Sequence, residues 1–197
     1  MGEVLVLVDH VDGAVRKTTT ELLTIARRLG EPAAVFFGAG VENATETLAK
    51  FGAAKVYLVD APELADYLVA PKAEALVAVA QQASPSAILV TSSAEGKEIA
   101  ARAAVRLESG LVTDAVDVDA SGVATQSAFA ASYVVTSKVT SGTPIITVKP
   151  NSAAPEEAPA AAAVENVAVT FSPAATTAKI TGVEPRAKSG FSPIQTV

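Results

Sequence analysis

The sequence contains no cysteine and no tryptophan, and its one histidine is His10. Without cysteine, disulfides, thiolate metal sites and thiol nucleophiles are excluded. No cluster of Asp and Glu has the spacing of a ligand set, and one histidine alone does not hold a metal ion. We therefore expect no metal site.

Charged residues are also scarce, at 18% of the 197 residues, and acids outnumber bases to give a net charge of −6. Nucleic-acid binding depends on clustered Lys and Arg, so this balance argues against a nucleic-acid partner. The apolar runs are far shorter than the roughly 20 residues that a bilayer span needs. No basic region followed by a long apolar stretch opens the chain. We expect no membrane insertion and a cytoplasmic location.

What the sequence does contain is a regular alternation of short apolar runs and longer helical patterns. Buried strands are predicted at Val4–Val8, Ala33–Phe37, Lys55–Val59 and Ala87–Thr91. Helices are predicted over Thr18–Leu29, Val41–Phe51, Lys72–Gln82 and Ala94–Leu107. This alternation predicts an α/β fold with right-handed βαβ units and a mostly parallel open sheet with flanking helices.

The pattern changes after Leu107 and becomes rich in β-strands. Strands joined by short turns are predicted at Leu111–Val118, Val123–Ala130, Ser132–Thr140 and Pro144–Lys149. They indicate a β-rich extension, antiparallel in part, that pairs with the edge of the parallel sheet. The domain organisation that follows is an α/β sheet domain with this extension over 1–150, a Pro/Ala-rich loop over 151–163, closing strands of the same domain over 164–184, and a tail over 185–197. The two closing strands are expected at Val164–Phe171 and Lys179–Val183.

Three polar residues follow the fourth predicted strand and are candidates for binding a nucleotide phosphate: Ser92, Ser93 and Lys97. They lie where open α/β sheets place their ligands, at the start of a helix, whose N-terminus attracts anions. Only Gly96-Lys97 of the Walker pattern is present, and Glu95 and Glu98 oppose an anion. Ser93 also suits a helix N-cap. A nucleotide site and a purely structural role both stay open.

Other candidate motifs are weaker. The stretch Asp9–Gly13 is more typical of a turn than of a cation or ribose site. His10 would be the base of a Ser/His/Asp hydrolase, but Ser93 is not in a Gly-x-Ser-x-Gly elbow. Gly38-Ala39-Gly40 lacks the third glycine of a dinucleotide fingerprint and is typical of a tight strand-to-helix turn. We predict no catalytic residue and no enzyme.

Several stretches, taken in order, resemble the N-terminal domain of electron transfer flavoprotein α subunits of the actinobacterial type. They are Val4–His10, Phe51–Tyr57, Glu95–Leu107 followed by Gly110–Asp114, and Thr181–Arg186. The third is the most specific. In the family, a helix with Gly-Lys/Arg-Glu and a central Arg leads through a short turn into a strand that begins Leu/Val-x-Thr/Ser-Asp.

The resemblance implies a fold shared with adenine nucleotide alpha hydrolase-like domains and a partner β subunit of related fold. In that heterodimer FAD carries electrons from dehydrogenases, including those of fatty acid β-oxidation, to a membrane-linked quinone reductase. FAD is held mainly by a second α domain, which does not follow Gly190 in this sequence. We therefore expect a chain truncated before the FAD-binding domain, with no FAD ligand of its own and an architectural, β-subunit-docking role.

Two other functions remain open. One is a stand-alone adenine-nucleotide-binding domain that uses Ser92, Ser93 and Lys97. The other is a module that forms homo-oligomers through exposed apolar strands.

Overall fold

The structure is a computed structural model that describes residues 2–184. Its strands are β1 Glu3–Leu7, β2 His10–Val11, β3 Ala14–Val15, β4 Glu31–Phe37, β5 Lys55–Val59, β6 Ala87–Thr91, β7 Leu111–Val118, β8 Val123–Ala128, β9 Tyr133–Lys138, β10 Ile145–Val148 and β11 Ala163–Asn166. Its helices are α1 Lys17–Leu29, α2 Val41–Lys50, α3 Glu63–Asp66, α4 Val69–Ala83 and α5 Ala94–Arg106.

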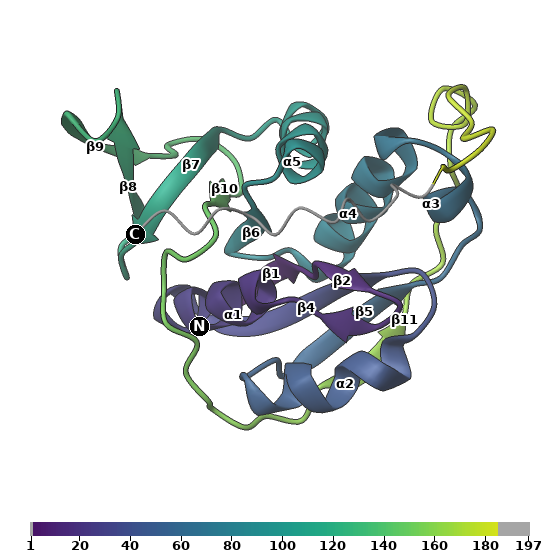
Figure 1. Cartoon of the computed structure of the whole chain (residues 1–197), viewed down its shortest axis with the longest axis horizontal. Helices are drawn as coiled ribbons and strands as arrows, with labels where there is room; N and C mark the ends of the chain where they lie inside the picture. Colours follow the sequence, from purple (N-terminus) through teal and green to yellow (C-terminus); the bar gives the residue numbers. More distant parts are fainter. Residues whose placement is uncertain (1, 185–197) are drawn as a thin grey trace, which may run out of the picture.

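Nine strands form one sheet in the order β11-β5-β4-β1-β6-β10-β7-β8-β9 (Figure 1). Strands β11 to β7 in this order are parallel, and β7, β8 and β9 run antiparallel. The α/β fold with a mostly parallel sheet and flanking helices is therefore confirmed. Within the described range, none of the helices has the length and apolar character to cross a membrane.

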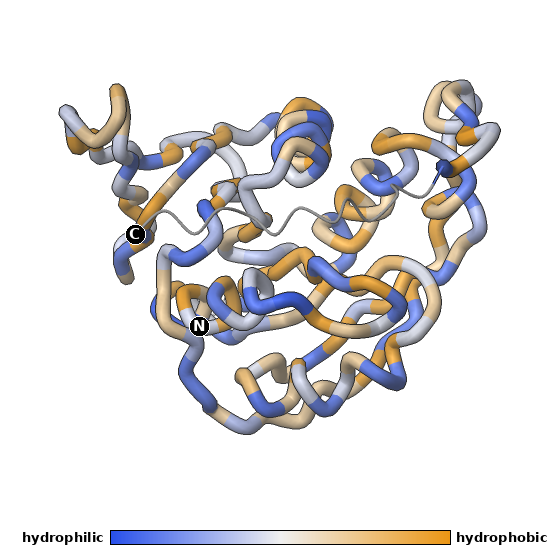
Figure 2. Tube along the Cα trace, viewed as in Figure 1, coloured by the Kyte–Doolittle hydropathy of each residue, from blue (hydrophilic) through white to orange (hydrophobic). Residues whose placement is uncertain are grey.

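Helices cover both faces of the sheet because the side chains of each strand alternate between two apolar cores. Val4 and Val6 of β1 pack on one face with Leu23 and the rest of the buried side of α1 and α2. Leu5 of β1 packs on the other face with Leu76 of α4 and the apolar side of α5. Figure 1 shows these two helix pairs on opposite sides of the sheet, and Figure 2 shows apolar segments along the central strands.

The first turn of the chain contains a small hairpin that the sequence patterns do not reveal. Strands β2 and β3 pair antiparallel across Asp12 and Gly13. Both turn residues have positive φ, 49° and 82°, as a two-residue type I′ hairpin turn requires. The turn character expected of Asp9–Gly13 thus includes a short β-ribbon.

The β-rich region lies differently from the predicted edge extension. Strand β10 is inserted between β6 and β7, and Ile145 pairs in parallel with both Ile88 and Leu111. All four β10 residues are buried, which is why this strand takes an interior position. Among the described strands, β8 and β9 alone form an antiparallel extension beyond the parallel sheet.

From β10 the chain crosses to the opposite edge of the sheet, where β11 pairs with β5. The crossing segment, 151–162, contains no helix and is bonded to α1 and α2. Backbone N–H groups of Asn151 and Glu156 donate to Glu21 Oε2 at 2.8 Å and to Thr24 Oγ1 at 3.0 Å. The backbone N–H of Ala160 donates to the carbonyl oxygen of Ala49 at 2.8 Å.

The closing strands are shorter than predicted. β11 ends at Asn166, and the predicted strand Lys179–Val183 is wrong, because only one bridge forms there, between Tyr67 and Lys179. This segment meets the loop between α3 and α4 instead of a strand edge, so no ladder can form. The tail 185–197 lies outside the described residues.

Candidate functional site

A cleft of about 530 Å³ lies at the carboxyl ends of β1, β4 and β5, where open α/β sheets bind ligands. Its charged lining side chains are Asp9, Asp60, Glu95 and Lys72. The ammonium of Lys72 is ion-paired with the carboxylate of Glu95. With three carboxylates and a paired lysine, the cleft has an electrostatic balance that disfavours an anionic ligand.

The candidate residues Ser92 and Lys97 lie together where β6 ends and α5 begins, but both are bonded to Asp114. Ser92 Oγ donates to Asp114 Oδ1 at 2.5 Å, and Lys97 Nζ lies 3.4 Å from the same oxygen. Thr147 Oγ1 donates to Ser92 Oγ at 3.0 Å and accepts from the backbone N–H of Asp114 at 3.1 Å. We call Ser92, Lys97, Asp114 and Thr147 the Asp114 network; it joins β6, α5, β7 and β10.

A β-bulge in β7 aims Asp114 at these partners. Two residues, Thr113 and Asp114, stand opposite the single residue Thr147 of β10, and Asp114 has a left-handed φ of 58°. The Ser92 hydrogen bond lowers the pKa of the Asp114 carboxyl below its ordinary value; burial opposes this, and Lys97 adds to the lowering. The network therefore holds Asp114 as a carboxylate near neutral pH.

The third candidate, Ser93, is the N-cap of α5. Its Oγ accepts a hydrogen bond from the backbone N–H of Gly96 at 2.9 Å. A capping side chain already satisfies one of the free donors at the helix start. The structure thus brings Ser92, Ser93 and Lys97 to one place, with each of them engaged inside the chain.

His10 is also engaged inside the chain. Its Nδ1 accepts from the backbone N–H of Gly13 at 3.2 Å, and its Nε2 lies 2.9 Å from the carbonyl oxygen of Phe37. This pairing requires the proton on Nε2. The ring also stacks on Phe36, with centroids 4.0 Å apart. His10 therefore fastens the β2–β3 hairpin to β4, and neither ring nitrogen is available as a base.

The remaining candidates have structural contacts as well. Asp9 pairs with Arg16 at 3.4 Å, and Asp12 forms the hairpin turn. Gly40 precedes α2 with a φ of 92° and lies against Gly13, whose added Cβ would fall 2.2 Å from the Gly40 carbonyl oxygen. The described side chains also include no group of three or more His, Cys, Asp and Glu that could hold a metal ion.

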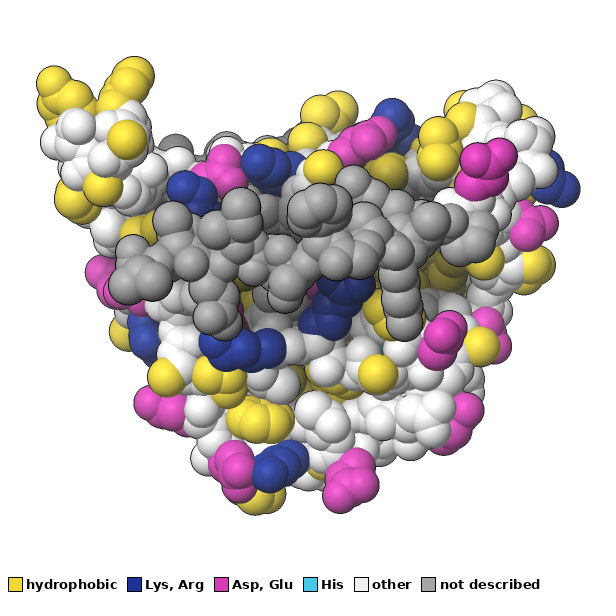
Figure 3. Space-filling view, viewed as in Figure 1, with side chains coloured by type: hydrophobic (Ala, Val, Ile, Leu, Met, Phe, Trp, Pro, Cys, Tyr) yellow, Lys and Arg dark blue, Asp and Glu magenta, His cyan; other side chains and the backbone are white. Residues whose placement is uncertain are grey.

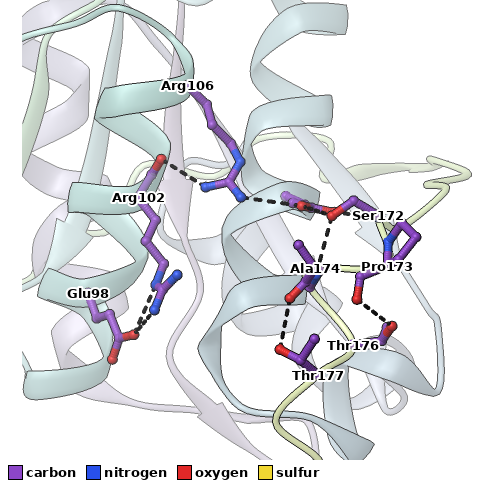
Figure 4. Close-up of polar contacts among 10 residues, drawn as sticks. Glu98, Arg102, Arg106, Ser172, Pro173, Ala174, Thr176 and Thr177 are labelled. Carbon is purple, nitrogen blue, oxygen red and sulfur yellow. Dashed lines mark hydrogen bonds and ion pairs between the residues drawn. The ribbon is translucent and has the colours of Figure 1, made fainter.

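A further polar cluster, centred on Glu74, has no counterpart among the residues predicted from the sequence. Glu74 of α4 accepts from the backbone N–H and the Oγ of Ser172, at 2.9 and 2.6 Å, and pairs with Arg106 of α5 at 3.3 Å. Figure 4 shows Arg106 reaching from its helix toward the turn at Ser172. The carboxylate thus ties the segment after β11 to the α4–α5 pair. No local sequence signal marks it, since Glu74 and Ser172 are 98 residues apart.

These features define a class of protein: an open, doubly wound α/β domain whose polar groups at the carboxyl edge are largely bonded to one another. Residues 4–172 match the family model for the electron transfer flavoprotein domain. The chain therefore belongs to the electron transfer flavoprotein family, which confirms the resemblance in its sequence.

Proteins with similar sequences are named as electron transfer subunits. The electron transfer flavoprotein subunit alpha of Mycobacterium tuberculosis (strain ATCC 25618 / H37Rv) is 43% identical over 171 residues, which are 86% of this chain and 53% of the relative. The Mycobacterium leprae subunit alpha is 41% identical over 188 residues, 94% of this chain and 58% of the relative. The acryloyl-CoA reductase electron transfer subunit beta of Anaerotignum propionicum is 29% identical over 122 residues, 59% of this chain and 33% of that protein. The chain spans about half the length of the mycobacterial relatives.

Proposed function

We propose that this chain acts as the N-terminal, architectural domain of an electron transfer flavoprotein α subunit. It docks a β subunit and supports a flavin-binding domain without holding FAD itself. The observation that carries this proposal is the combination of a match to named α subunits with a carboxyl edge whose candidate ligand groups are internally bonded.

In this proposal FAD and electron transfer belong to the assembled heterodimer, located in the cytoplasm. It would accept electrons from dehydrogenases, among them those of fatty acid β-oxidation, and deliver them to a quinone reductase. The chain has no catalytic role of its own. The names of its relatives, which are electron transfer subunits, support this assignment.

A second candidate function is a stand-alone adenine-nucleotide-binding domain, favoured by the cleft of about 530 Å³ at the carboxyl edge. A phosphate bound by Ser92, Ser93 and Lys97 would have to displace Asp114 from Lys97. Micromolar binding of AMP or ATP that is lost on Lys97→Ala would establish this alternative.

Size-exclusion chromatography of the chain with a matching β subunit and FAD tests the proposal, with absorbance recorded at the flavin bands. We expect a colourless one-to-one complex. A yellow peak from the chain alone would mean that this domain holds the flavin, and the assignment of roles would be wrong.

A further inference from the structure

The β8–β9 hairpin exposes a cluster of large apolar side chains. Four large apolar side chains within seven residues are open to solvent: Phe129 is 82% exposed, Tyr133 64%, Val134 74% and Val135 43%. Figure 1 draws the hairpin projecting away from the helices at the upper left, and Figure 3 shows apolar side chains on that projection. Contiguous exposed apolar surface of this kind marks interaction sites.

Both faces of β9 and its outer edge are largely exposed. Val134 points to the opposite side of the ribbon from Tyr133 and Val135, because side chains alternate along a strand. β9 is the last strand of the sheet order, so its outer backbone groups have no strand partner in the described chain. An open edge with apolar faces is a template for pairing with another chain.

The turn at the tip is not built from turn-forming residues. Phe129, Ala130 and Ala131 have φ values of 49°, 52° and 67°, a left-handed region that favours glycine or asparagine. The strained turn places Phe129 at the end of the hairpin, where it meets the Tyr133 ring edge-on at 5.7 Å. Backbone strain of this kind collects at functional segments.

Charge sets the chemistry of the partner surface. Residues 120–155 contain no Asp or Glu, although the whole chain carries a net charge of −6. Lys138 is the one charged residue of the two hairpin strands. A surface that covers this hairpin must therefore be apolar, because the hairpin offers little to satisfy a buried charge.

Residues 2–184 offer no such cover. The described chain ends beside α3, where Leu68 N–H donates to the Ala178 carbonyl oxygen at 3.0 Å, at the opposite end of the molecule from the hairpin (Figure 1). In a second copy, the cleft at the carboxyl edge is lined by Asp9, Asp60 and Glu95. Burying those carboxylates against Phe129 would cost desolvation energy that the apolar hairpin tip cannot offset. A different protein is the better complement.

We propose that the β8–β9 hairpin is the docking element for the β subunit, which receives both faces in an apolar groove and pairs a strand with the free edge of β9. This inference rests on the proposed function and assigns the surface that performs it. The hairpin supplies an aromatic side chain at its tip, Phe129, a residue type that is enriched in protein interfaces.

The test measures the affinity of the full chain for its β subunit by titration. The hairpin variant is Phe129→Ser with Val134→Thr, and the matched control is Leu68→Ser with Val105→Ser, which removes two apolar side chains exposed elsewhere. All four positions are largely exposed, and circular dichroism and the melting temperature check that each variant folds. We expect the hairpin variant to raise Kd at least about tenfold and the control to change it less than about twofold.

A label at the strand itself gives a second readout. Because the chain has no cysteine, Val135→Cys accepts a single environment-sensitive fluorophore, and Val105→Cys on α5 serves as its control. Adding the β subunit should shift the emission of the first label to shorter wavelength and leave the second unchanged.

The outcomes separate the two proposals. A complex that both double variants form equally well overturns the hairpin as docking element and leaves the proposed function standing. Failure of the unmodified chain to bind a β subunit overturns both. Concentration-dependent self-association that the hairpin variant abolishes, in place of β-subunit binding, identifies a second copy as the occupant and also overturns the inference.

Discussion

Replacing Glu74 with glutamine should loosen the segment after β11 from the α4–α5 pair. The substitution keeps the size of the side chain but turns one acceptor oxygen into an NH2 donor. In the protein, Oε2 accepts from the Ser172 backbone N–H, while Oε1 accepts from Ser172 Oγ and from Arg106. Glutamine can accept at only one of these two positions, and in either orientation its NH2 group faces another donor.

The contacts set the magnitude of the loss. A hydrogen bond to a charged acceptor contributes about 1.5–3 kcal/mol to stability. The Glu74 side chain is only 14% exposed, so solvent screens its interactions little. We therefore expect Glu74→Gln to lower the free energy of unfolding by about 2 kcal/mol near neutral pH.

The same loss should depend on pH. Burial raises the pKa of Glu74, but the hydrogen bonds from Ser172 and the charge of Arg106 outweigh it, and the pKa in the folded protein lies below the ordinary value of 4.5. A lowered pKa means that the carboxylate stabilises the fold fully above its unfolded pKa and loses this effect as the pH falls through the folded pKa. The difference between Glu74→Gln and the unmodified chain should therefore be constant at neutral pH and shrink below about pH 4.

Urea unfolding at several pH values measures both effects. The control is Glu98→Gln, which breaks an exposed pair with Arg102 within α5 and should cost no more than about 0.5 kcal/mol. If Glu74→Gln costs no more than this control near neutral pH, or if its cost is the same in acid, the carboxylate does not tie the segment down as we argue.

Four further substitutions test the fold. Ser93→Ala should lower stability by about 1 kcal/mol through loss of the α5 N-cap, measured by thermal unfolding. At Gly122, which has a φ of 78°, an added Cβ meets nothing within 4 Å, so Gly122→Ala should lower stability by about 1–2 kcal/mol. Gly13→Ala adds the clash with Gly40 and should lower stability clearly more. Equal losses of stability for the two variants would contradict that packing. Phe36→Ala, at a fully buried position, should cost about 3–5 kcal/mol in urea unfolding.

The first half of the fold can be predicted from sequence because its signals are local. Val4–Val8 is a continuous apolar run, as a strand buried on both faces requires, and the apolar spacing of Thr18–Leu29 fixes the buried side of α1. The position of β10 cannot be predicted in this way. The apolar and β-branched residues of Ile145–Val148 predict a strand but do not indicate its position in the sheet. Its interior position follows from its pairing with β6 and β7.

The wrong prediction at Lys179–Val183 has the same origin. Apolar and β-branched residues suit a strand, but a strand also needs a free edge to pair with, and this segment lies against the α3–α4 loop. The Asp114 network is equally remote from sequence reasoning. Thr113-Asp114 belongs to a recognisable motif, yet the direction of Asp114 depends on a bulge and a left-handed φ, which no propensity of aspartate in a strand indicates.

The Asp114 network connects the carboxyl edge to the exposed hairpin. An anion site needs cations that are free to meet the ligand, but in the described structure Lys97 and Lys72 each face a carboxylate. What the network does is lock the bulge of β7 against β6, β10 and α5 through Ser92 and Thr147. Because β8 pairs with β7 directly after this bulge, the network also fixes the base from which the hairpin projects. A rigid base would lower the ordering cost of the docking that we propose for the hairpin. The polar groups that resemble a ligand site in the sequence therefore support that proposal by holding the base of the hairpin in place.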